Sequence, residues 1–174
     1  AKEMGLPVGK LICASNANNV LTDFIRTGTY NKNRPFHTTA SPSMDILVSS
    51  NLERLLYALC GSDTEVAGYM QQLREQGSYT VDALKAKIQE VFAGSFCNDI
   101  QTREKIGHAW RDHRYLIDTH TAVAYHVLDD YRRETGDTTP SVVVSTASPF
   151  KFCDQVLRGI GGTADAFGPA LIRR

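Results

Sequence analysis

Two short runs in the chain are apolar almost throughout. The first is KLICA at 10–14, and the second is SVVVS at 141–145. Strands of this kind, which lack polar–apolar alternation, are typical of a parallel sheet that is covered on both faces. We therefore predict buried strands at 10–14 and 141–145, and a further short strand at 94–97.

Longer segments repeat their apolar residues at the period of an α-helix. The repeat is most regular from 118 to about 134. Thr80 and Thr102 precede two other repeats and are predicted to cap them. Ser148 and Pro149 suit the cap and the first position of a last helix. The predicted helices cover 20–25, 52–59, 66–74, 80–92, 102–110, 118–134 and 149–158.

This order of elements indicates an α/β fold, with a partial parallel-sheet layer and many helices. Two clear strands are few for a complete doubly wound sheet, so we expect the missing strands upstream of Ala1. Residues 1–160 are predicted to form one domain. The glycine-rich segment 161–174 is predicted to be a flexible tail.

Composition and charge exclude several classes of protein. The chain has 174 residues, of which 42% are hydrophobic, and its nineteen basic residues balance nineteen acidic ones. No run of like charge offers a surface for nucleic acid or an anionic membrane, and no apolar stretch is long enough to span a bilayer. The four cysteines are scattered, which predicts reduced thiols and a cytoplasmic protein.

Candidate ligand-binding residues follow the two predicted strands. In open α/β sheets, ligands bind beyond the carboxyl ends of the strands. Asn16, Asn18 and Asn19 come after the first strand, and Ser145 and Thr146 come after the second. In both places a plainer alternative stays open, because these side chains also suit helix caps and turns.

The histidines give no metal site, since no two of them stand four residues apart as a helical pair of ligands would. His120 lies near the start of the most regular helix, between Asp118 and Thr121. A structural role is its default interpretation. The chain also lacks the GxSxG and GxGxxG motifs.

Four groups of motifs then occur in a fixed order. They are GLPV with LICASNANNVL, SPSMDI with SNLERLL, DTHTAVAY, and STASPFKF. Together they resemble threonine synthase, from just after the phosphate-binding glycine turn of that family. DTHTAVAY is similar to its (D/E)PH-x-AVA segment, and STASPFKF is similar to its (S/G)TAHPxKF segment.

The resemblance implies an incomplete pyridoxal-phosphate fold of the tryptophan-synthase-β type (fold type II). It also implies the conversion of O-phospho-L-homoserine and water to L-threonine and phosphate. The family's Schiff-base lysine, in an SFKD-like context, and its phosphate turn do not occur in these residues. The chain therefore resembles roughly the C-terminal half of the enzyme. We expect it to contain no catalytic residue and to be inactive without the remainder of the protein.

Site residues follow from the resemblance position by position. Thr146 is expected to face the pyridine nitrogen of the cofactor. A neutral hydroxyl there makes the ring a weaker electron sink, which suits elimination and replacement. Asn16, Asn18 and Asn19 match the family's Asn-x-Asn segment at the rim on the cofactor side. His120 carries over with either a structural role or a role at the rim.

Three positions qualify the resemblance. Lys151 aligns with the lysine of the HPxKF segment, so we reject it as the cofactor lysine. Thr119 stands where the family usually has proline, and Ser148 stands where histidine is common. Two alternatives remain: a non-catalytic α/β binding module that docks through an exposed sheet edge, and another enzyme of the same fold type, such as a serine/threonine dehydratase. The SPSMDI and STASPFKF segments argue against the dehydratase.

Overall fold

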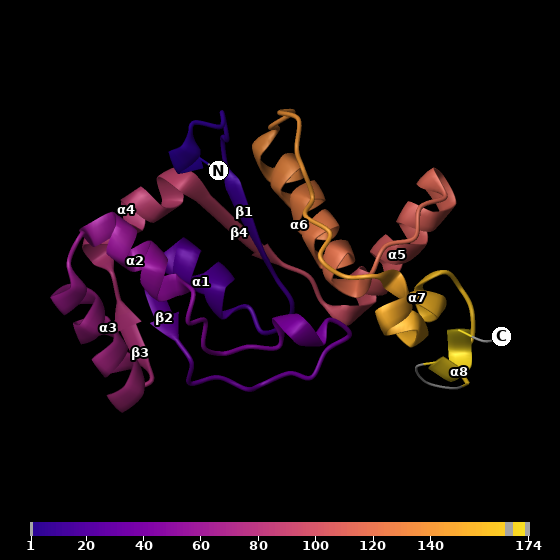
Figure 1. The fold of residues 1–174 in the computed structure, drawn as a ribbon, viewed down its shortest axis with the longest axis horizontal. Helices are drawn as coiled ribbons and strands as arrows, with labels where there is room; N and C mark the ends of the chain where they lie inside the picture. Colours follow the sequence, from indigo (N-terminus) through magenta and orange to yellow (C-terminus); the bar gives the residue numbers. More distant parts are fainter. Residues whose placement is uncertain (1, 166–168, 173–174) are drawn as a thin grey trace.

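A pair of parallel strands lies at the centre of the molecule (Figure 1). The computed structural model describes residues 2–165 and 169–172. Strand β1 (Leu11–Ser15) pairs with β4 (Phe92–Phe96), with Leu11 opposite Phe92 and Ser15 opposite Phe96. The α/β class and its small parallel sheet are thereby confirmed.

Successive side chains of β1 point to opposite faces, and a different helix covers each face. Ile12 and Ala14 pack against Val123 and Val127 of α6 (Thr119–Thr135). Cys13 packs on the other face, in the core that includes α1 (Val20–Thr27). This two-sided burial explains why the strand is apolar throughout.

The first half of the chain builds a compact helical layer around a second sheet. Strands β2 (Thr29–Asn31) and β3 (Ser78–Thr80) pair antiparallel. Tyr30 and Tyr79 stack there, with ring centroids 5.3 Å apart. Their burial ties the small sheet to α1. The surrounding helices are α2 (Leu52–Cys60), α3 (Asp63–Glu75) and α4 (Asp82–Val91).

The second half is a helical group that packs against the other side of the central pair. Helix α5 (Asp99–His113) contacts both α6 and α7 (Cys153–Gly159). Ile106, Ala122 and Val156 form the buried core between these three helices. The remaining elements are short: η1 (Lys2–Met4), η2 (Pro42–Met44), η3 (Pro149–Phe152) and α8 (Pro169–Ile172).

The predicted helices are all present, but two of their caps were wrong. Thr80 is the last residue of β3, and Val81 takes the cap position of α4 without a side-chain bond. Thr102 lies buried inside α5, which begins earlier. Asn98 caps that helix in a reciprocal capping box with Gln101.

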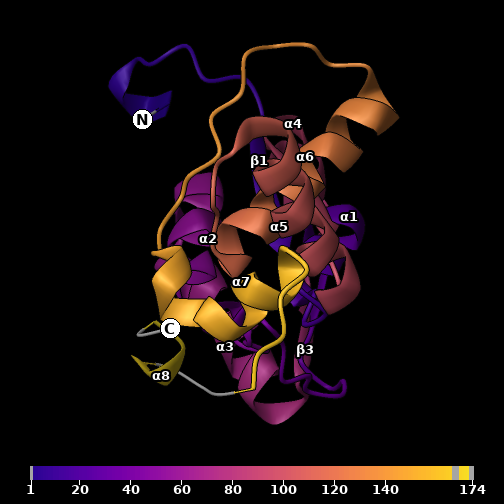
Figure 2. The same cartoon turned by 90° about the vertical axis from the view of Figure 1, so that its right-hand side faces the viewer.

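The predicted strand at 141–145 was also wrong. The segment is an irregular loop, and Val142 and Val144 are 90% and 71% exposed. Figure 2 shows the loop crossing from the end of α6 to η3 and α7 without joining either sheet. A β-branched run favours extended backbone, but a strand also needs a neighbouring strand to satisfy its N–H and C=O groups.

The tail prediction is not tested. Helix α8 lies within 161–174, and residues 166–168, 173 and 174 of that segment lie outside the described residues. Across the described part of the chain, no helix is both long enough and apolar enough to cross a membrane.

Candidate functional site

The residues that follow β1 form a buried polar cluster. The side-chain amide of Asn16, which is 1% exposed, donates to Thr39 Oγ1 at 2.8 Å and to Asp45 Oδ1 at 2.7 Å. Its Oδ1 accepts the backbone N–H of Asn18 at 2.9 Å. Ser41 Oγ lies 3.1 Å from the same amide nitrogen. Asn16 therefore links β1 to the loop that runs through Thr39 and Asp45.

Asn18 holds the same loop at a second point. Its side-chain nitrogen donates to the carbonyl of His37 at 2.8 Å, and its Oδ1 accepts the His37 N–H at 2.9 Å. Asp45 Oδ1 lies 3.1 Å from the same side-chain nitrogen. The side-chain amides of Asn16 and Asn18 thus bond to this loop. They would affect a ligand by fixing the conformation of the loop.

Asn19 differs from the other two asparagines. It occupies the cap position of α1, but its side chain makes no cap bond. Instead its Oδ1 accepts from Arg34 at 3.0 Å, and Arg34 also pairs with Asp23 at 2.7 Å. The half-buried Asn19 therefore lies beside a paired cation, away from the Asn16–Asp45 contacts.

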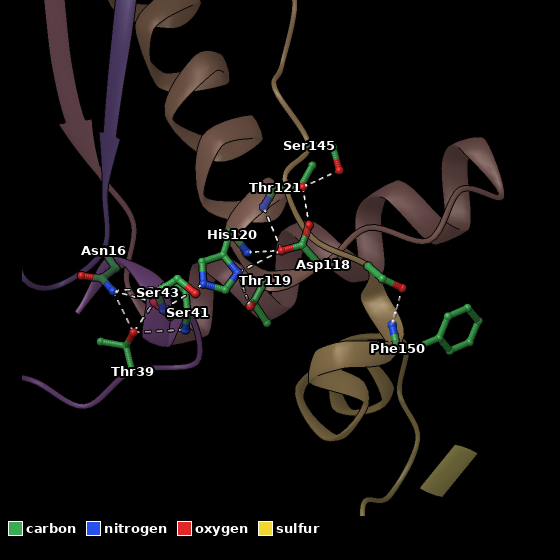
Figure 3. Close-up of polar contacts among 11 residues, drawn as sticks. Asn16, Thr39, Ser41, Ser43, Asp118, Thr119, His120, Thr121, Ser145 and Phe150 are labelled. Carbon is green, nitrogen blue, oxygen red and sulfur yellow. Dashed lines mark hydrogen bonds and ion pairs between the residues drawn. The ribbon is translucent and has the colours of Figure 1, made fainter. Parts of the chain in front are cut away.

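A second polar cluster lies at the start of α6 (Figure 3). Asp118 caps the helix by accepting the N–H of His120 at 2.8 Å, and its carboxylate is fully buried. Its Oδ1 lies 3.0 Å from His120 Nδ1. The hydroxyl of Thr121 donates to its Oδ2. Every one of these donors comes from the first turn of the helix, which explains why a buried carboxylate is tolerated there.

Ser145 is tied to this second cluster, and Thr146 follows it. The Oγ atoms of Ser145 and Thr121 lie 2.9 Å apart. The Thr121 hydroxyl is directed at both the Asp118 carboxylate and Ser145 Oγ, so its single proton is shared between these two acceptors. Thr146 is exposed. The prediction that Thr146 follows a strand was wrong, because residues 141–146 are one irregular loop.

Between Ser145 and α5 lies a cavity of about 320 Å³. It is lined mainly by apolar surface, including Ile117, Tyr125 and Val143, with Thr121 and Ser145 at its polar side. A cavity of this size suits a small organic molecule.

The two clusters are joined through His120. Its Nε2 accepts the backbone N–H of Ser43 at 3.1 Å, and Ser43 lies in the same loop as Ser41 and Asp45. Sequence reasoning named the asparagines and Thr146 but missed Thr39 and Asp45. Asp45 could have been found, because it is the one carboxylate inside the SPSMDI segment.

The described residues offer no metal site, and the thiols of Cys13 and Cys97 are not activated. No group of three potential metal ligands occurs among them. Burial raises the pKa of the Cys13 thiol, and it raises that of Cys97 to about 11 against a weaker opposing hydrogen bond from Thr102. Both cysteines are therefore neutral at physiological pH and unsuited to act as nucleophiles.

Residues 121–173 match the family described as "Threonine synthase, C-terminal". The match begins at Thr121 and includes Ser145 and Thr146. The resemblance to threonine synthase is confirmed.

Threonine synthases are also similar to the chain over most of its length. Threonine synthase of Pseudomonas aeruginosa is 37% identical over 164 residues, which are 92% of this chain and 34% of that protein. Human threonine synthase-like 1 is 39% identical over 163 residues, which are 92% of this chain and 22% of that protein. The chain therefore spans about a fifth to a third of these relatives.

A solved threonine synthase structure has the same fold. The crystal structure of threonine synthase from Brucella melitensis, with pyridoxal phosphate bound, is 36% identical to the chain and superimposes with a TM-score of 0.85. The superposition covers 99% of this chain and 36% of that one. The chain thus has the fold of one portion of a pyridoxal-phosphate enzyme.

Proposed function

We propose that these residues are the C-terminal part of a threonine synthase, and that 1–160 belong to its catalytic domain. The complete enzyme would convert O-phospho-L-homoserine and water to L-threonine and phosphate in the cytoplasm. The observation that carries this proposal is the match of 121–173 to the threonine synthase C-terminal family, because it includes the candidate residue Thr146. The Brucella melitensis structure, which has pyridoxal phosphate bound, supports the assignment of pyridoxal phosphate as the cofactor.

Pyridoxal phosphate would supply an electron sink that stabilises negative charge on the substrate carbon chain. Thr146 suits the pyridine nitrogen, since its exposed hydroxyl can donate one hydrogen bond without transferring a proton outright. The hydrogen bond that Ser145 accepts from Thr121 fixes the backbone immediately before Thr146. Asn16 and Asn18 hold the loop at the rim in one shape. Asn19 follows Asn18 but pairs with Arg34, and we assign it to the outer part of the rim.

A chain of these 174 residues alone should bind no cofactor covalently, because it contains no lysine in an SFKD-like segment. Incubation with pyridoxal phosphate, borohydride reduction and peptide mapping would test this. We expect no stoichiometric adduct on any lysine. A stoichiometric adduct on Lys151 would contradict the proposed division of the enzyme.

The activity itself is tested in the complete protein. We expect release of phosphate from O-phospho-L-homoserine, and a loss of about tenfold or more in kcat for Thr146→Ala, the size typical of a group that acts on the reacting system. Thr163→Ala is the matched control, since Thr163 is an exposed residue of the C-terminal segment. Equal rates for the two variants would exclude Thr146 from the site.

A non-catalytic binding module is the second candidate, and the exposure of Val142 and Val144 favours it. Such a module would bind a partner through this apolar loop. The assay above separates the two functions, because a binding module would release no phosphate even as the complete protein.

A further inference from the structure

The protonation of His120 can be deduced from its neighbours. A backbone N–H can only donate, so Nε2, which lies 3.1 Å from the N–H of Ser43, must accept. The ring proton is then on Nδ1, where it faces Asp118 Oδ1 at 3.0 Å. His120 is therefore a neutral imidazole whose tautomer is set by a buried carboxylate.

The imidazole has two partners, Ser43 and Asp118, and each is connected to a different group of site residues (Figure 3). On one side, Ser43 belongs to the turn closed by the Met44 N–H and the Ser41 carbonyl, 2.9 Å apart. Ser41 Oγ in turn lies 3.1 Å from the Asn16 amide. The Asn16 rim is thus connected to His120 by hydrogen bonds through a single tight turn.

On the other side, Asp118 accepts the hydroxyl of Thr121, whose oxygen contacts Ser145 at 2.9 Å. Thr146 follows directly. Hydrogen bonds and short stretches of backbone therefore link Asn16, the 41–45 turn, the first turn of α6 and Ser145, and His120 lies at the middle of this set.

We propose that His120 is a positioning residue for the cofactor and substrate of this site. Its neutral imidazole, oriented by Asp118, holds the 41–45 turn against the start of α6. This fixes the Asn16 and Asn18 rim relative to Thr146. The inference rests on the proposed function, since the rim and Thr146 are the groups that we assign to a phosphorylated pyridine cofactor and its amino-acid substrate.

Simple packing is the competing explanation. The ring of His120 also lies 4.7 Å from that of Phe152, measured between centroids, and it is 8% exposed. If His120 only fills space, any side chain of similar volume should serve. If it positions the turn, the acceptor facing Ser43 is the essential feature.

Two amide substitutions separate these explanations. In His120→Gln, the side-chain oxygen can reach the position of Nε2 and accept the Ser43 N–H. In His120→Asn, the shorter amide reaches only the position of Nδ1, so the Ser43 N–H loses its acceptor. Both variants lose the ring contact with Phe152. Gln keeps only the acceptor for Ser43, and Asn keeps only a donor for Asp118, so a difference between the variants shows which of the two bonds holds the turn. His108→Asn, at an exposed position of α5, is the control.

The first readout is amide hydrogen exchange of residues 41–45 in the complete protein, with and without pyridoxal phosphate. We expect His120→Asn to exchange about fivefold faster there, the effect of losing one hydrogen bond. His120→Gln and His108→Asn should stay within about twofold of the unmodified protein. Equal exchange in the Gln and Asn variants would overturn the proposal. If His120→Asn does not fold, unprotected 41–45 amides in folded His120→Gln would overturn it too.

The second readout is the rate of phosphate release from O-phospho-L-homoserine. We expect His120→Asn to lower kcat about tenfold or more with a smaller change in KM, as a small misplacement of site groups does, and His120→Gln to recover most of it. Unchanged kcat in His120→Asn would overturn the positioning role. If the unmodified protein releases no phosphate, the proposed function fails, while hydrogen exchange still decides whether His120 holds the turn.

Discussion

At the scale of single residues, Asp118 is a fully buried carboxylate with several partners to lose. Its buried carboxylate caps α6 and accepts from both His120 Nδ1 and the Thr121 hydroxyl. Asp118→Ala should lower the free energy of unfolding by roughly 3 kcal/mol, because a lost cap is added to two buried donors without an acceptor. Urea unfolding followed by circular dichroism measures this.

Ser62→Ala is the matched control for Asp118→Ala. Ser62 caps α3 by accepting the Glu65 N–H, but at a partly exposed site. Its loss should cost only about 1 kcal/mol. Equal losses for the two variants would show that Asp118 acts as a cap and nothing more.

Cys97 gives a prediction on pH. Because burial raises the pKa of its thiol from 9.0 to about 11, the unfolded chain loses this proton first as the pH rises. The contribution of Cys97 is therefore fully present below about pH 9 and declines towards about pH 11. Cys97→Ala should show a smaller alkaline loss of stability in urea titrations. Val127→Ala is the control, because it leaves a cavity in the same cluster but removes no titrating group. It should show the full alkaline loss of stability.

At the scale of elements, the sequence predicted what periodicity and local chemistry determine. The regular apolar repeat of α6 and the Gly136 that ends it are visible in the sequence, and so is the two-sided burial of β1. The three-residue strands β2 and β3 were missed, because they are too short to show a period. The 141–145 segment was assigned wrongly because strand pairing is a non-local property.

The same limit applied to the site. The position of Asn16 just after a strand was visible in the sequence, whereas the strand expected before Thr146 is absent. That Thr39 and Asp45 would surround Asn16 was not visible, because each contact joins residues more than twenty positions apart in the sequence. Neither was the bond from His120 to Ser43, which joins residues 77 positions apart.

The crossing of α5 and α7 depends on a close contact between glycines. A Cβ at Gly107 would lie 2.6 Å from the carbonyl oxygen of Gly159. Gly107→Ala should therefore destabilise the protein by roughly 1–3 kcal/mol, since the backbone of α7 would have to move. Gly68→Ala, inside α3, has open space for its methyl group and should stabilise by up to about 1 kcal/mol. Thermal unfolding of both variants measures the difference, and stabilisation by both would contradict this helix contact.

At the scale of the whole molecule, the central sheet and the 141–145 loop both lack neighbouring segments. Parallel sheets are normally covered at their faces and extended by further strands. Here two strands form the whole parallel sheet of the described residues, and the 141–145 loop lies apart from it with Val142 and Val144 in water. Exposed apolar side chains that lie close together often mark a surface that another molecule covers.

These exposed valines predict self-association of the 174-residue chain. Burying two valine side chains contributes about 3 kcal/mol, or about a hundredfold in an association constant. The double variant Val142→Lys with Val144→Lys should weaken association by that order, because each lysine adds charge where the contact would form. Val48→Lys is the control, since Val48 is 53% exposed but lies in another loop. Sedimentation velocity over a concentration series measures the effect. Equal weakening by Val48→Lys would mean that added charge, rather than the 142–144 surface, governs association.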